Sequence, residues 1–156
     1  MQTSNPTMQD FLGIKFLSSD HKKLIASMQV TERSSQVHGL LNGGASLALC
    51  EICAGTMSLK LLEGTEYTAL GAQVSANHLR SAPLGAIVRC IVTPLKTGSR
   101  LHVMDCKVVN EKDEVLCSAT VTNMVVPRAQ IAGGKKTADS TAAEYTSAPA
   151  GGLCHE

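Results

Sequence analysis

One carboxylate, Glu51, stands in an apolar run that has the length of a long helix, from Gly43 to Leu62. Glutamate is rarely buried without a partner, because burial in an apolar site either costs several kcal/mol or raises the pKa of the carboxyl group. A carboxylate in such a place is a candidate functional residue. The alternative is that Glu51 faces water or pairs with Lys60 or with an arginine elsewhere.

The same run begins with residues suited to binding negative charge. Asn42 is a good N-cap, and Gly43 and Gly44 follow it. The free N–H groups of a first helical turn attract anions, and glycines let a ligand approach that backbone. The helix therefore offers an oxyanion-type donor at its start and a carboxylate two turns later.

Helix geometry separates these two groups. Gly43 and Glu51 are eight residues apart in the sequence. At 1.5 Å per residue this is about 12 Å, too far for both to touch one carbonyl group. Two copies of the helix lying antiparallel across a two-fold axis would bring Gly43 of one subunit to Glu51 of the other. A shared site therefore predicts a dimer.

The composition excludes several classes of function. The formal net charge is +1, charged residues make up 17%, aromatic residues make up 3%, and tryptophan is absent. These values argue against nucleic-acid binding. The polar start of the chain has no signal-peptide pattern, and Glu51 and Lys60 interrupt the apolar run, which argues against a membrane span. We expect a soluble, cytoplasmic protein.

The cysteines show neither a disulfide framework nor a metal-ligand pattern. Cys50 and Cys53 have C-x-x-C spacing but lie in the middle of the predicted helix, and no second pair follows at zinc spacing. We interpret them as small apolar core residues and predict no metal site. The other cysteines fall in predicted strands or near the C-terminus: Cys90, Cys106, Cys117 and Cys154.

Hydrophobic periodicity predicts an α+β domain over residues 1–127. We predict a helical turn at 7–12, strands at 14–17 and 24–30, a helix at 43–62, and strands at 67–80, 85–95, 100–110 and 114–126. An antiparallel sheet would then wrap around one long helix. Residues 128–156 are rich in Ala, Ser, Thr and Gly, and are predicted to form a flexible tail.

Three segments in this order and spacing carry a family resemblance. They are QVHGLLNGGAS at 36–46 with Glu51 after it, ANHLRSA at 76–82, and PLKTGSR at 94–100. On these motifs the chain resembles the hotdog-fold, PaaI-like acyl-CoA thioesterases, in the branch that includes the 4-hydroxybenzoyl-CoA and 1,4-dihydroxy-2-naphthoyl-CoA enzymes. The resemblance covers about residues 11–126.

The resemblance implies a mechanism and an assembly. Glu51 would be the general base or nucleophile at the thioester carbonyl, and the Gly43 N–H would stabilise the oxyanion. Gln36 would position the water or the carbonyl, and Asn42 would cap the helix and orient the substrate carbonyl. The enzyme would need no cofactor, since CoA is part of the substrate. The subunits would form a homodimer that assembles into a homotetramer, and menaquinone biosynthesis is a candidate pathway.

A second set of residues matches positions that hold the coenzyme A nucleotide and phosphates in relatives. The arginines and the lysine suit phosphate, and the hydroxyl and loop N–H groups suit the remaining acceptors. The alternative is that these residues are solvated strand ends. The set comprises His78, Arg80, Ser81, Lys96, Thr97, Gly98, Ser99 and Arg100.

The chain departs from the family pattern at two positions. Asn42 stands where this branch usually has histidine, and Gly55 stands where relatives often have a serine. Asparagine can cap a helix and donate a hydrogen bond but cannot transfer a proton near neutral pH. Hydrolysis of an aromatic or medium-chain acyl-CoA remains the leading hypothesis. A non-catalytic acyl-CoA-binding paralogue and a hydratase or dehydratase on the same fold are the alternatives.

Overall fold

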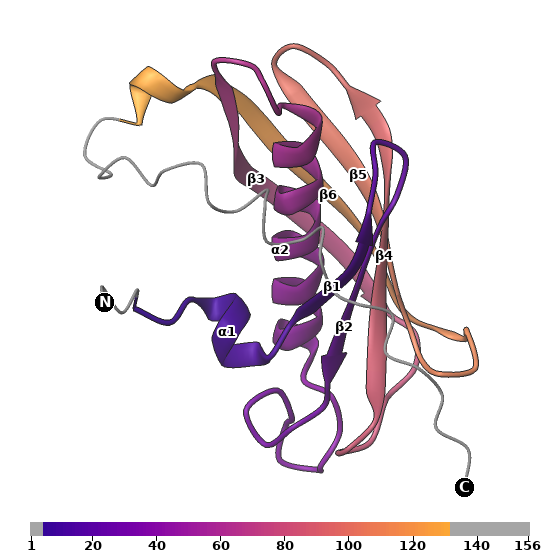
Figure 1. Ribbon diagram of the computed structural model, residues 1–156. Coiled ribbons are helices and arrows are strands. Elements are labelled where there is room, and N and C mark those ends of the chain that lie inside the picture. The colour runs from indigo at the N-terminus through magenta and orange to yellow at the C-terminus, as the bar shows by residue number, and fades with distance from the viewer. Residues whose placement is uncertain (1–4, 132–156) are drawn as a thin grey trace, which may run out of the picture.

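The long apolar helix, α2 (Gly43–Leu61), lies against the concave side of a six-stranded antiparallel sheet that curves around it (Figure 1). The computed structural model describes residues 5–131. The strand order is β1-β2-β4-β5-β6-β3, so β1 and β3 form the two edges. The strands are β1 (Lys15–Ser19), β2 (Leu24–Gln29), β3 (Tyr67–His78), β4 (Ile87–Thr97), β5 (Leu101–Val109) and β6 (Val115–Pro127).

Every predicted element is present, with shifts of a few residues at its ends. The predicted turn at 7–12 is α1 (Met8–Leu12), capped by Thr7, and β1 extends to Ser19. The first residues of the predicted tail form the 3-10 turn η1 (Arg128–Gln130), in which the N–H of Arg128 donates to the carbonyl of Glu66 at 2.9 Å. The rest of that predicted tail, 132–156, lies outside the described residues.

One face of α2 supplies the core. Its buried residues recur at helical spacing and are mostly small: Ser46, Leu49, Cys50, Cys53, Ala54, Met57 and Ser58. They pack against fully buried side chains of the sheet, including Val88, Val92, Met104 and Val108. On the opposite face Glu51 is exposed and Leu59 remains 39% exposed. The sheet of one chain therefore covers only one face of this apolar helix.

A buried amide ties α2 to the middle of the sheet. Asn123 on β6 is 1% exposed, and its Nδ2 donates to the carbonyl of Ala54 at 3.2 Å and to the hydroxyl of Ser58 at 2.8 Å. A buried NH₂ group needs such acceptors, because leaving a buried donor unpaired costs about 1–3 kcal/mol. These bonds fix the height of α2 above β6.

None of the helices within residues 5–131 is both long enough and apolar enough to cross a membrane.

A buried histidine lies beside the Asn123 amide. His102 on β5 is the register partner of Asn123 and is 4% exposed. Burial disfavours the charged imidazolium, so the pKa of His102 is lowered. The unfolded chain takes up a proton at this histidine near pH 6.5, whereas the folded chain does so only at lower pH.

This depressed pKa predicts a pH-dependent stability. The contribution of neutral His102 is fully present above about pH 6.5 and is lost as the pH falls through the folded-state pKa. We expect the thermal midpoint of the wild type to drop as the pH is lowered from about 7.5 to about 5. The drop should be smaller in His102→Leu. Equal pH slopes in the two proteins, measured by circular dichroism, would contradict this account.

Candidate active site

The start of α2 leaves a backbone donor unpaired. Asn42 has extended backbone geometry, and its Oδ1 accepts the N–H of Gly44 at 2.7 Å, which confirms the predicted N-cap. The first turn contains no acidic residue, and the N–H of Gly43 donates to no group in residues 5–131. The positive end of the helix is therefore available to an incoming oxyanion.

A histidine from the end of β3 lies directly against this donor. A β-carbon at position 43 would come within 3.0 Å of Nε2 and 3.3 Å of Cε1 of His78. Any side chain larger than hydrogen at Gly43 would push the imidazole away. The helix start and the end of β3 are therefore fitted to each other by the glycine, and His78 is placed beside the candidate oxyanion site.

The loop before α2 positions Gln36. Gly39 has a φ of +70°, which favours glycine, and its N–H donates to the carbonyl of Gln36 at 2.9 Å. The Oε1 of Gln36 accepts the N–H of His38 at 2.7 Å. The amide oxygen is thus occupied, and the side-chain NH₂ group remains to donate to a carbonyl or a water. His38 itself is exposed.

These groups meet in one cavity of about 490 Å³. The guanidinium of Arg80 at its rim is held by a 2.9 Å hydrogen bond from Nη1 to the carbonyl of Val115, which leaves further N–H groups for an anion. The cavity is lined by Gln36, Leu40, Leu41, Gly43, Ser46, His78, Leu79, Arg80, Ser81 and Leu116. Two of these residues, Gln36 and Gly43, were predicted as catalytic, and three, His78, Arg80 and Ser81, as coenzyme A-binding.

Glu51 does not line this cavity. It is exposed on the face of α2 that the sheet leaves uncovered, and its carboxylate lies against Gly71 of β3. Lys60, proposed as an alternative partner, pairs instead with Glu63 at 3.1 Å, so that alternative is wrong. Glu51 itself is free of ion pairs within residues 5–131. The exposure agrees with the other alternative, a glutamate facing water in the single chain.

The predicted coenzyme A residues fall into two groups at opposite ends of the sheet. His78 pairs with Cys117 at one end, whereas the β4–β5 hairpin that carries Lys96 to Arg100 lies at the other. The carbonyl of Arg100 accepts the N–H of Val125, and Val125 pairs with Ala69 of β3. Ala69 lies nine residues before His78 on that strand. At about 3.3 Å per residue the groups are roughly 30 Å apart. One chain alone cannot bring them to one ligand.

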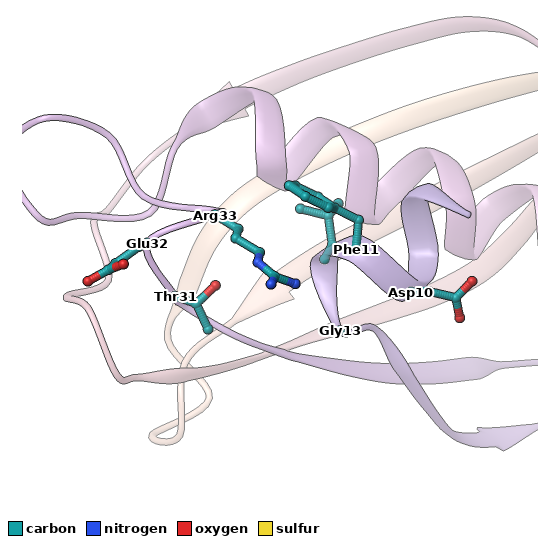
Figure 2. Close-up of a pocket in the computed structure, with 7 residues that line it drawn as sticks. Asp10, Phe11, Gly13, Thr31, Glu32 and Arg33 are labelled. Carbon is teal, nitrogen blue, oxygen red and sulfur yellow. The ribbon is translucent and has the colours of Figure 1, made fainter. Parts of the chain in front are cut away.

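A second cavity, of about 300 Å³, lies between α1 and the loop after β2 (Figure 2). Its lining includes both acidic and basic side chains, and the guanidinium carbon of Arg33 lies 5.2 Å from the ring centre of Phe11. This cation–π contact engages the arginine within the chain. The cavity holds none of the predicted catalytic residues: it is lined by Asp10, Phe11, Leu12, Gly13, Thr31, Glu32 and Arg33.

The helical cysteines form part of the core, as predicted, and the strand cysteines lie beside them there. The sulfur atoms of Cys50, Cys90 and Cys106 all lie within 4.8 Å of one another, and all three residues are fully buried. Hydrogen bonding with Cys106 and Cys50, together with burial, raises the pKa of Cys90. The Cys50 contact and burial likewise raise the pKa of Cys117. The same contacts with Cys50 and Cys90 lower the pKa of Cys106 to about 5. Protonated thiols such as those of Cys90 and Cys117 pack as small apolar groups.

Comparison with known proteins identifies the class. The model of the thioesterase superfamily matches residues 38–117. A 1,4-dihydroxy-2-naphthoyl-CoA hydrolase from Escherichia coli is 37% identical over 119 residues, which are 76% of this chain and 86% of the relative. The chain therefore belongs to the thioesterase superfamily, a group of hydrolytic enzymes.

Two solved structures support the fold. A mutant thioesterase from Pseudomonas aeruginosa has 34% identity and a TM-score of 0.74, over 78% of this chain and 86% of that one. A Streptococcus mutans protein solved with acetyl CoA has 25% identity and a TM-score of 0.67, over 73% and 89%. The predicted hotdog fold is confirmed.

The capping bond generates a prediction about Asn42. Removing the side chain in Asn42→Ala should lower the free energy of unfolding by about 1 kcal/mol, because the N–H of Gly44 loses its acceptor. Asn42→Asp keeps an acceptor at that position and should retain most of the stability. Urea unfolding measures both. If Asn42→Ala is as stable as the wild type, the cap contributes nothing.

Proposed function

We propose that the enzyme hydrolyses an acyl-CoA thioester to a free acid and CoA. The observation that carries the proposal is the unpaired N–H of Gly43, at the positive end of α2, opening into a cavity with Gln36 and Arg80. Such a donor stabilises the negative charge that develops on a carbonyl oxygen during acyl transfer. The Streptococcus mutans protein was solved with acetyl CoA, and the E. coli relative is named as a 1,4-dihydroxy-2-naphthoyl-CoA hydrolase. Both names support coenzyme A as the carrier of the acyl group.

In the proposed reaction Glu51 takes a proton from a water molecule as that water attacks the thioester carbonyl. The Gly43 N–H and the NH₂ group of Gln36 donate to the carbonyl oxygen, which becomes negative. The tetrahedral intermediate then collapses with cleavage of the C–S bond, and the CoA thiolate receives the proton that Glu51 took from the water, which restores the carboxylate. Direct attack by Glu51 to form an anhydride is the alternative role of this carboxylate.

The proposed site needs two subunits. Gly43 and Glu51 lie about 12 Å apart on one helix, and the coenzyme A residues lie at opposite ends of the sheet. The uncovered face of α2 and the unpaired edge of β3 are both available to a second copy. We propose a homodimer in which two β3 edges continue one sheet, and a homotetramer built from two dimers.

We propose an aromatic acyl group, such as 1,4-dihydroxy-2-naphthoyl, with medium-chain groups as the second candidate. The named activity of the E. coli relative supports the aromatic group and, with it, the menaquinone pathway. The proposed location is the cytoplasm. Asn42 in place of histidine favours a specialised enzyme in which the amide orients the carbonyl, because the cap it forms and the free Gly43 donor are both intact.

Replacing the base tests the chemistry. Glu51→Gln keeps the volume of an exposed side chain but removes its basicity, so the thermal midpoint should stay close to that of the wild type. Turnover should fall by at least about 100-fold, the usual loss for a general base. Thiol release from a panel of aromatic and medium-chain acyl-CoA esters measures it. Wild-type turnover in this variant would show that Glu51 is not catalytic.

Sedimentation tests the assembly. The apolar face of α2 is uncovered and β3 is unpaired in one chain, as in the subunits of obligate oligomers. We therefore expect a dimer or a tetramer at roughly micromolar protein concentration. Analytical ultracentrifugation measures the mass. A stable monomer that still hydrolyses acyl-CoA would exclude a site shared between subunits.

A further inference from the structure

A glycine in the edge strand makes room for the carboxylate of Glu51. A β-carbon built at Gly71 would lie 2.7 Å from Oε1 of Glu51, with Cδ at 3.7 Å and Cγ at 3.8 Å. The φ of Gly71 is not in the left-handed region, unlike those of Gly39 and Gly64. The backbone alone would therefore accept alanine at position 71. The space taken by the Glu51 carboxylate is what favours glycine there.

The strand is also irregular at this point. Gly71 pairs with Asn123, whereas Gln73 pairs with Thr122, so Ala72 is an extra residue between the two pairs. Such a β-bulge bends the strand and re-aims neighbouring groups, and bulges are frequent beside active sites. The bulge directly follows Gly71, the residue that faces the carboxylate.

The spacing between α2 and this strand is fixed by buried bonds. Asn123, the register partner of Gly71, donates to the carbonyl of Ala54 and the hydroxyl of Ser58. Ala54 lies three residues after Glu51 on α2. The helix that carries the carboxylate and the strand that receives it are thus joined through one buried side chain on β6. The carboxylate cannot avoid a larger residue at 71 by a shift of the whole helix without breaking those bonds.

We infer that Gly71 is a positioning residue for Glu51. Its missing side chain, together with the adjacent bulge, forms a notch in β3 that sets where the carboxylate lies. The inference rests on the proposed role of Glu51 as the base. A methyl group at this position would force the carboxylate to move by roughly 1 Å, and displacements of that size can cost about 100-fold in rate. The group that moves is the free end of an exposed side chain, so stability changes little.

Gly71→Ala is the direct test. For Gly71→Ala we expect kcat to fall by about 10- to 100-fold. We expect KM to change by less than about twofold, because the groups that hold the substrate are unchanged. The thermal midpoint should stay close to that of the wild type.

A double substitution separates positioning from a sheet defect. Glu51→Asp shortens the side chain by one methylene and withdraws the carboxylate from position 71. In that background Gly71→Ala should cost less than about threefold in kcat, so that the two losses do not multiply. A purely structural role for Gly71 would give multiplied losses and a lower thermal midpoint in both backgrounds.

The outcomes distinguish this inference from the proposed function. Loss of activity in Glu51→Gln with wild-type kcat in Gly71→Ala would overturn the positioning role alone. Wild-type activity in Glu51→Gln would overturn the role of Glu51 and the inference with it. A Gly71→Ala protein that melts markedly earlier, and whose loss of activity persists undiminished in the Glu51→Asp background, would also overturn the inference, because the bulge itself would then require glycine.

Discussion

The packing of one face of α2 into the concave sheet is the contact on which the rest of the structure depends. That face is built from alanine, serine and cysteine between a few larger side chains, so the helix can lie close to the strands. Asn123 adds the only described side-chain bonds between β6 and α2, to Ala54 and Ser58. Once the buried face is fixed in this way, the rotation of the helix is fixed, and Glu51 must point away from the core.

This rotation divides the chemistry between the N-terminal end and the outer face of one helix. The N-terminal end presents the Gly43 donor beside His78, and the outer face presents Glu51 beside β3. Neither group can approach the other, because a helix is rigid over two turns. A fold with one central helix can therefore bring these two groups together only across two copies of the chain. The separation of Arg80 from the β4–β5 hairpin imposes the same requirement on ligand binding.

The elements of this fold could be predicted from the sequence because each leaves a local pattern. Alternation marks β2, the long apolar run marks α2, and Asn42 before two glycines marks where the helix begins. The family resemblance predicts Gln36 and Gly43 as catalytic residues and His78, Arg80 and Ser81 as coenzyme A-binding residues, because each lies in a short motif. The structure brings these five together around one cavity.

What the sequence could not give is the long-range register. Nothing local indicates that Gly71 faces Glu51, since their contact depends on how β3 pairs with β6 and on the extra residue Ala72. A glycine inside a strand pattern was the available signal, because it often marks a bulge or a close approach. The distance between His78 and Lys96 was likewise hidden, because it follows from the strand order rather than from either motif.

The cysteine-rich core also makes the molecule a reporter of its own unfolding. Cys50, Cys53, Cys90, Cys106 and Cys117 have no solvent exposure in the folded chain and carry no disulfide. Alkylating reagents attack the thiolate form at an accessible sulfur, so these five positions stay protected until the sheet and α2 separate. The rate at which these five positions become labelled therefore reports opening of the core, with no need to introduce a labelling site by mutation.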